Sequence, residues 1–205
     1  MIWFTSDPHY YHANVIKYCS RPYSSVEEMN EALIRNWNNV VSPGDTVYCL
    51  GDFSLAFRPI ETITPRLMGN KILVPGNHDF CHSAHKKGRK DIVKWKQKYA
   101  DNGWFVEAEQ SQYNIPGVAR VNMCHMPYRG DTTDDRYHSF RMVDDGRILL
   151  CGHVHEKWKT KRTPKGTLMI NVGVDAWNQQ LVSIDELIRL INHEQSIRTS
   201  ETSND

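Results

Sequence analysis

The sequence has little net charge and no long hydrophobic run. Its 205 residues include 25 lysines and arginines and 24 aspartates and glutamates, so the formal net charge is only +1. So small a charge creates no global attraction to nucleic acid or to a membrane surface. No hydrophobic run approaches the roughly 20 residues that cross a bilayer, and the N-terminus lacks the basic start of a signal peptide. We therefore expect a cytoplasmic protein with no membrane partner.

Cysteine is scarce and widely spaced. The five cysteines include no Cys-x-x-Cys pair, and an odd, scattered set argues against a disulfide framework. Cys49, Cys124 and Cys151 fall inside hydrophobic runs, so they are predicted to be small core residues. The chain also lacks internal repeats and a linker. Its length and its 40% hydrophobic content suit one domain with a substantial core.

The pattern of elements predicts an α/β fold. Residues 1–192 are expected to form the domain, and residues 193–205 a disordered tail, because the tail has no core-forming pattern. Helices are predicted at residues 26–39, where Ser25 and Glu28 form a capping-box signature, and at 89–100, with a short helix running from Asp185 to Ile191. Strands are expected at 2–5, 46–50, 71–74, 104–108, 112–115, 118–123, 147–151, 158–162, 166–171 and 181–183.

Five of these hydrophobic runs end in residue types that bind metals. Ligands gather at the strand ends of α/β sheets. Each motif taken alone is weak evidence, because an aspartate or histidine after a strand is more often a turn residue. Five such motifs, each directly after a hydrophobic run, are harder to explain as turn residues. The candidate ligands are Asp7, His9, Asp52, Asn77, His125, His153 and His155.

The chemistry of these seven candidates predicts a pair of ions. They are carboxylates, imidazoles and one amide, without a thiolate. That set suits Mn²⁺, Fe²⁺, Co²⁺, Ni²⁺ or Zn²⁺ rather than a structural zinc site of cysteines. Seven ligands are too many for one tetrahedral ion and suit two divalent metal ions that share a carboxylate. We favour Mn²⁺ among these metals.

The order of the motifs resembles that of the calcineurin-like metallophosphoesterase superfamily, in particular its small bacterial and phage members. The match covers residues 2–175 and includes Gly76-Asn77-His78-Asp79. The resemblance implies a single-domain, four-layer α/β/β/α sandwich, with two central sheets and helices outside. It assigns Asp7, His9, Asp52 and His155 to the first ion. It assigns Asp52, Asn77, His125 and His153 to the second, with Asp52 as the bridge.

The resemblance also implies an activity, the hydrolysis of phosphate esters. A hydroxide that bridges the two ions would attack phosphorus, and His78 would be the general acid for the leaving oxygen. Asp79 would orient His78 or a neighbour, or it would only cap a turn. We expect the substrate to be a nucleotide-like phosphomonoester or phosphodiester. The segment after Gly51-Asp52 lacks the aspartate and arginine of the protein-phosphatase branch, which argues against a protein phosphatase.

Substrate contacts are less well specified by the sequence. His12 and Asn14 resemble positions in small members of the superfamily, with local loop hydrogen bonding as the alternative. Tyr128 could stack on a base or only pack. The basic stretch at residues 81–98 either lies near the mouth of the site or forms a solvated helix face. Candidates for a phosphate clamp are Arg58, Arg129, Arg136 and Arg141.

Two other functions stay open. The first is a nuclease that uses the basic stretch to hold single-stranded or short nucleic acid. The second is a scaffold on the same fold with a dead site, which would be expected to have lost ligands or His78. The sequence leaves the physiological substrate, the native metal and the oligomeric state undecided.

Overall fold

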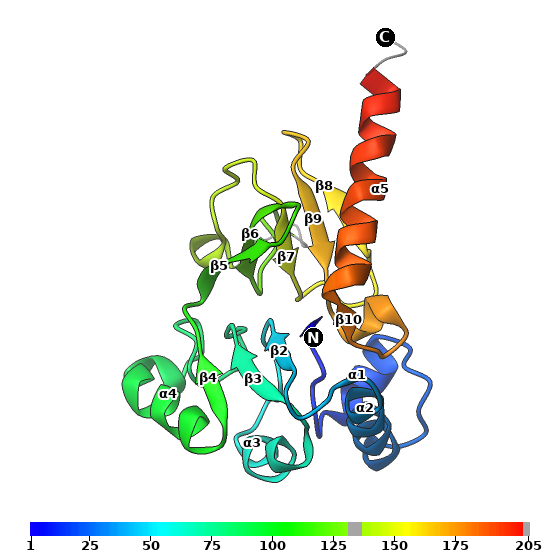
Figure 1. Cartoon of the computed structure of the whole chain (residues 1–205). Helices are drawn as coiled ribbons and strands as arrows, with labels where there is room; N and C mark the ends of the chain where they lie inside the picture. Colours follow the sequence, from blue (N-terminus) through cyan, green and yellow to red (C-terminus); the bar gives the residue numbers. More distant parts are fainter. Residues whose placement is uncertain (131–136, 203–205) are drawn as a thin grey trace.

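Two five-stranded sheets form the centre of the molecule in the computed structural model, which describes residues 1–130 and 137–202 (Figure 1). The first sheet has the order β10-β1-β2-β3-β4. Its four N-terminal strands are parallel to their neighbours, and β10 pairs with β1 in the antiparallel sense. The strands are β1 (Ile2–Thr5), β2 (Thr46–Cys49), β3 (Asn70–Leu73), β4 (Trp104–Val106) and β10 (Val182–Ser183).

The second sheet has the order β5-β6-β7-β9-β8. Its three central strands, β6, β7 and β9, are parallel, and the outer pairs β5–β6 and β8–β9 are antiparallel. The strands are β5 (Gln110–Ile115), β6 (Ala119–Cys124), β7 (Leu149–Cys151), β8 (Thr160–Arg162) and β9 (Leu168–Asn171).

Helices cover the face of the first sheet that points away from the second (Figure 1). The predicted N-cap is confirmed, because the Ser25 hydroxyl accepts a hydrogen bond of 3.1 Å from the Glu28 N–H. The first of these helices, α1, was not predicted from the sequence. Residues 6–14, which include its first two residues, were predicted to form a polar loop. The helices are α1 (Ala13–Tyr18), α2 (Val26–Val40), α3 (Arg58–Thr62) and α4 (Ile92–Asp101), with 3₁₀ turns at Thr64–Arg66, Gly88–Lys90, His138–Phe140 and Val174–Trp177.

One hydrophobic core lies between the two sheets. Phe4 and Leu50 of the first sheet and its strand ends pack against Met123, Leu150 and Ile170 of the second, and all five are fully or almost fully buried. Burial of side chains of this size stabilises the fold by about 1.5–3 kcal/mol each. This packing fixes the position of one sheet relative to the other, and therefore also the relative positions of the loops at their ends.

The C-terminal helix corrects a prediction. Residues 193–202 continue α5 (Ile184–Thr202) instead of forming part of a disordered tail, and residues 203–205 lie outside the described residues. Contacts with edge strand β8 account for the extension. Thr160 Oγ1 donates to Glu194 Oε1 at 2.9 Å, and Arg162 donates to the Glu194 carbonyl oxygen at 2.8 Å. The sequence pattern lacked a core-forming face, but this polar docking stabilises the helix.

The α/β class, the single domain and the stacking of two sheets agree with the predicted sandwich. The outer face of the second sheet carries a separate core of β6, β7 and β9 side chains, which Met126, Tyr128 and Met142 of the following connection cover. Cys49, Cys124 and Cys151 are buried and all five cysteines are free thiols, as predicted. Among the described helices, none is long and apolar enough to span a membrane.

Candidate metal centre

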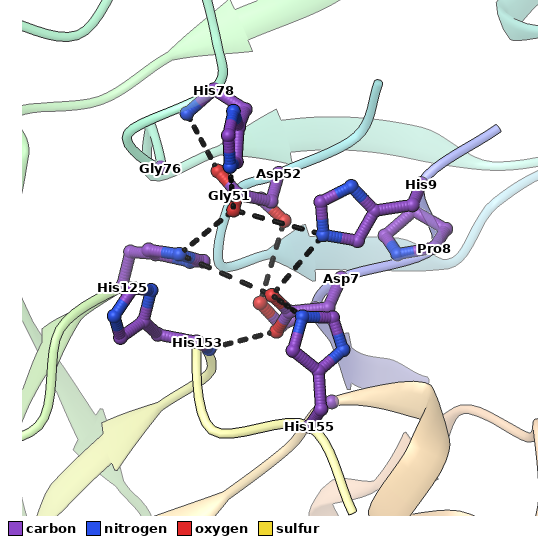
Figure 2. A network of polar contacts seen from close by, with 12 residues as sticks. Asp7, Pro8, His9, Gly51, Asp52, Gly76, His78, His125, His153 and His155 are labelled. Atoms are coloured by element: carbon purple, nitrogen blue, oxygen red, sulfur yellow. Dashed lines mark hydrogen bonds and ion pairs between the residues drawn. The ribbon is translucent and has the colours of Figure 1, made fainter. Parts of the chain in front are cut away.

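The predicted ligands lie at the carboxyl ends of parallel strands in both sheets. Asp7 and His9 follow β1, Asp52 follows β2, and Asn77 follows β3. From the second sheet, His125 follows β6, while His153 and His155 follow β7. Because neighbouring parallel strands end at the same edge, each sheet brings its own set together. The packing between the sheets then brings the two sets to one place (Figure 2).

Three side chains form what we call the first cluster: Asp7, His9 and His155. Each offers a ligand atom within 4.8 Å of the other two. His9 Nε2 lies 3.8 Å, and His155 Nε2 3.9 Å, from Asp7 Oδ1. With metal–ligand bonds of about 2.0–2.2 Å, two donors on one ion stand about 3–4 Å apart. The spacing therefore suits donors that share an ion.

Asp52, His125 and His153 form the second cluster, again with ligand atoms within 4.8 Å of one another. Asp52 Oδ2 lies 3.2 Å from His125 Nε2, and it also lies 3.7 Å from His9 Nε2 of the first cluster. A carboxylate that lies close to imidazoles of both clusters has the position expected of a ligand shared by two ions.

Several polar atoms of these clusters are buried without a hydrogen-bond partner. They are Asp7 Oδ1, His9 Nδ1 and Nε2, Asn77 Oδ1 and His125 Nε2. Such orphaned atoms are rare in folded proteins and costly to leave unpaired. All belong to predicted ligands and are oxygen or nitrogen donors. The residues present therefore fit a pair of divalent cations.

In one histidine of each cluster Nδ1 is occupied, which leaves Nε2 to face the other ligands. His125 Nδ1 lies 2.7 Å from the Leu50 carbonyl oxygen, which can only accept, so the ring donates from Nδ1. His155 Nδ1 lies 2.8 Å from Asp175 Oδ2. Hydrogen bonds of this kind set the tautomer and the ring orientation of metal-binding histidines.

Arg21 and Asp175 form a buried ion pair behind the first cluster. Arg21 Nε and Nη2 donate to the two Asp175 carboxylate oxygens at 2.7 and 2.9 Å. The same guanidinium donates to the carbonyl oxygens of Asp7, at 2.7 Å, and Pro8, at 2.8 Å. One side chain thus connects the loop after β1 to the residue that orients His155. Sequence analysis missed both residues, because nothing in their local patterns distinguishes them.

Backbone strain is concentrated in the ligands. Nine described residues other than glycine have a positive φ, and five of them are predicted ligands: Asp7, His9, Asp52, His153 and His155. The left-handed region is uncommon for such residues and costs of order 1–3 kcal/mol each. Strain of this kind persists where the surrounding structure imposes it, and it is typical of binding sites.

Two glycines allow the loops to approach the carboxylates. A Cβ atom on Gly76 would lie 2.4 Å from Asp52 Oδ1, and one on Gly152 would lie 2.3 Å from Asp7 Oδ2. Both distances are far below van der Waals contact. The glycines of the Gly76-Asn77-His78-Asp79 and Gly152-His153 motifs are therefore required by close packing around the ligands.

The electrostatics of the clusters favour positive charge. Burial opposes ionisation of Asp52, but the adjacent His125 imidazole holds the pKa of its carboxyl well below the usual range. Burial likewise opposes protonation of His125, yet Asp52 and Asp7 raise its pKa to about 9. Burial lowers the pKa of His9 to about 3, so this imidazole is neutral and has lone pairs to offer.

His78 and Asp79 occupy different environments. The His78 side chain is 44% exposed, its Nε2 lies 4.0 Å from Asp52 Oδ2, and its backbone N–H donates to Asp52 Oδ1 at 2.8 Å. Asp79 is fully buried, and its carboxylate accepts from the N–H groups of Asp52, Phe53 and Gly76 at 2.8–3.2 Å. None of the contacts given for the described residues joins Asp79 to the His78 ring. The predicted roles of Asp79, to orient His78 or a neighbour or to cap a turn, stay predictions.

A cavity of about 470 Å³ opens over the clusters. His9, Asp52, His78, His153 and His155 line it, together with the predicted substrate contact His12. Leu55, Tyr137 and Lys157 also line this cavity, and sequence analysis did not identify them. The cavity gives a phosphate ester access to both clusters at once.

The other predicted substrate contacts do not line this cavity. Asn14 on α1 and Arg58 on α3 are solvent-exposed. Tyr128 is 7% exposed and its hydroxyl bonds Asn122 and the Arg147 carbonyl, so it packs rather than stacks on a base. Arg129 lines a different cavity, beside Trp158 and Lys161.

The predicted phosphate clamp included two further arginines, and the structure describes one of them. Arg141 is buried and donates to the Pro127 carbonyl oxygen at 2.7 Å. Arg136 lies outside the described residues.

Comparison with known proteins agrees with this geometry. Residues 2–184 match the calcineurin-like phosphoesterase superfamily domain. The Gene 66 protein of Mycobacterium phage L5 is 34% identical over 93% of this chain and 94% of its own length. An uncharacterised protein of Methanocaldococcus jannaschii is also 34% identical, over 97% of this chain and 95% of its own.

The fold is likewise shared with a solved structure. A protein of unknown function from Aquifex aeolicus superposes with a TM-score of 0.67 at 25% identity, covering 93% of this chain and 98% of that one. The chain therefore belongs to the calcineurin-like phosphoesterase superfamily, as the motif order predicted. Membership supports metal-dependent hydrolysis of phosphate esters.

Proposed function

We propose that this chain is a two-metal-dependent hydrolase of phosphate esters, acting on a phosphomonoester or phosphodiester of a nucleotide-like small molecule. One observation carries the proposal. Buried donor atoms without a hydrogen-bond partner come from both sheets, and residues of both clusters line a cavity that is open to solvent and bordered by His78. A site that served only to stabilise the fold would have its buried polar atoms paired with one another.

The residues divide between the ions as the clusters do. Asp7, His9 and His155 would hold one ion, Asn77, His125 and His153 the other, and Asp52 both. When bound, such ions supply charge neutralisation for the phosphate and a nucleophilic water of lowered pKa. The chain's own contribution is to orient the imidazoles through Leu50 and Asp175 and to keep Asp52 ionised between the clusters.

His78 is placed to act on the leaving group. It is half-exposed, it borders the cavity, and its ring stands beside the bridging carboxylate without joining either cluster. In the proposed reaction it donates a proton to the leaving oxygen as the phosphorus–oxygen bond breaks. Asp79 supports this role indirectly, by joining the loops that carry Asp52 and His78.

The identity of the metal and the cellular location are also proposals. We propose Mn²⁺, with Fe²⁺, Ni²⁺, Co²⁺ or Zn²⁺ as alternatives, because a set of mixed oxygen and nitrogen donors can bind each of these ions. We propose a cytoplasmic enzyme with a small phosphorylated partner. The alternative of a scaffold with a dead site is disfavoured, because all seven candidate ligands and His78 are present.

Metal analysis and a pair of model substrates test the proposal. Protein purified from Mn²⁺-supplemented cells should hold two ions per chain. It should hydrolyse bis(p-nitrophenyl) phosphate, p-nitrophenyl phosphate or both, and the ratio of the two rates would separate diester from monoester chemistry. Glu31→Gln is a suitable control variant, because it breaks only the exposed Arg66–Glu31 pair. Protein that binds no metal, or that binds two ions and hydrolyses neither ester, would contradict the proposal.

A further inference from the structure

A second cavity adjoins the one over the metal centre. It measures about 340 Å³, and Leu55, His78 and Tyr137 line both. His78 therefore stands at the boundary between them. The proposed ligand Asn77 also lines the second cavity, as do Phe80, His85, Lys86 and Lys87, whereas the residues of the first cluster do not.

The two lysines of this second cavity have no acidic partner among the contacts of the described residues. Both are solvent-exposed. The nearby carboxylates are used elsewhere: Glu109 accepts from the N–H and hydroxyl of Ser83 at 2.7 and 2.6 Å, and Asp91 caps α4 through the Lys94 N–H at 3.0 Å. Within residues 1–130 and 137–202, two positive charges without an acidic partner thus border a cavity next to the proposed proton donor.

The chain holds these lysines in a folded loop. Gly88 packs so tightly on the Phe80 backbone that a Cβ would lie 1.7 Å from the Phe80 carbonyl oxygen. The Gly88 N–H donates to His85 Nδ1 at 2.9 Å, and the Phe80 and His85 rings are 4.3 Å apart. Since the turn is anchored at both ends, the positions of Lys86 and Lys87 relative to His78 are set by packing.

We propose that the leaving group of the substrate carries a second, anionic phosphate that this cavity binds through Lys86 and Lys87. The inference rests on the proposed function. If His78 protonates the leaving oxygen, the rest of the leaving group must extend past His78, and the second cavity is the space there. Water adds to phosphorus and releases one proton to solvent, the phosphorus–oxygen bond breaks, and the leaving oxygen takes the His78 proton, which His78 regains from solvent. The released alcohol keeps its phosphate beside the two lysines.

Paired substrates that differ by one phosphate test the inference. Propane-1,3-diol monophosphate and bisphosphate share the scissile bond, as do the thymidine dinucleotides TpT and TpTp. With the Mn²⁺-loaded protein, the phosphorylated member of a pair should have a KM lower by roughly tenfold, given two exposed ion pairs. A gain in both pairs indicates any phosphorylated leaving group, and a gain only for TpTp indicates a nucleic-acid strand.

Two double variants of equal charge separate this cavity from general surface charge. In Lys86→Ala/Lys87→Ala the KM ratio within a pair should fall toward one. In Lys90→Ala/Lys94→Ala, which removes two exposed lysines that do not line the cavity, it should stay near the wild-type value. Equal KM values within both pairs for the wild type, or equal effects of the two double variants, would overturn the inference and leave the proposed function standing.

A binding measurement keeps the two proposals distinguishable. Calorimetric titration with 3-hydroxypropylphosphonate, a non-hydrolysable analogue of the alcohol released from the bisphosphate, reports on the second cavity without turnover. Affinity should fall in Lys86→Ala/Lys87→Ala and not in Lys90→Ala/Lys94→Ala. Should no ester be hydrolysed, the proposed function fails. The same titration then supports the anion site if only the first double variant loses affinity, and rejects it otherwise.

Discussion

The first cluster is supported by charged side chains, whereas the second is supported mainly by the backbone. His155 is oriented by Asp175, which Arg21 ties to the loop after β1. In the second cluster, His125 is oriented by the Leu50 carbonyl oxygen. Support of the first kind needs two particular residues, 154 positions apart. Support of the second kind comes with the strand itself, because every strand end offers a carbonyl group.

This contrast predicts which substitutions affect one ion and which affect both. Residues common to the clusters should have the largest effects, and residues behind one cluster should affect that cluster alone. The variants below run from the largest expected effect to the smallest.

Asp52→Asn should impair both clusters, because Asp52 Oδ2 approaches imidazoles of each. The loss of a shared negative charge should weaken the binding of both ions and lower kcat by roughly 10³-fold or more. Metal content after dialysis and the rate with bis(p-nitrophenyl) phosphate measure the two effects. If one of the two ions kept its wild-type affinity, the bridging role of Asp52 would be refuted.

His78→Ala should separate chemistry from metal binding. His78 belongs to neither cluster, so the variant should keep two ions while kcat falls by about 10²–10⁴-fold. The effect should be smaller with p-nitrophenyl esters than with alkyl esters, because nitrophenolate needs less protonation to leave. A variant with unchanged kcat toward alkyl esters would remove the proton-donor role.

Asp79→Asn should destabilise the loops behind the second cluster. The new amide would set an N–H₂ group against the backbone N–H donors of Asp52, Phe53 and Gly76. We expect a loss of about 3 kcal/mol in the free energy of unfolding, measured with urea at pH 8. Asp91→Asn, which alters the exposed N-cap of α4, is the control and should cost less than about 1 kcal/mol. Equal losses would show that Asp79 has no special structural role.

Asp175→Asn should weaken the first cluster selectively. The amide can no longer bind both Arg21 and His155 as a carboxylate does. Affinity for one of the two ions should fall by about 10–100-fold, while the other stays near wild type. Titration with Co²⁺, followed by its visible absorption, resolves the two steps, with Glu31→Gln as the ion-pair control. An equal loss of affinity for both ions would indicate general damage to the fold.

Most of the strands could be predicted from the sequence, because hydrophobic runs bounded by polar turns are a local signal. The predicted α5 ended too early, since its extension depends on Glu194 meeting Thr160 and Arg162 of a distant strand. Of the residues predicted to contact substrate, most do not line the cavity over the clusters. Asn14, Arg58 and Tyr128 have suitable chemistry, yet local sequence cannot tell whether such side chains face a cavity, solvent or the core.

Seven candidate ligands could be read from the sequence, because each follows a hydrophobic run and has the chemistry of a metal donor. The resemblance of the motif order to the superfamily also implied their division between two ions, but the supporting Arg21–Asp175 pair and the lysine-lined cavity could not be predicted from the sequence. Each of these depends on which strand ends become neighbours once two sheets pack face to face. That packing results from contacts between residues far apart in the chain, and no local pattern encodes it.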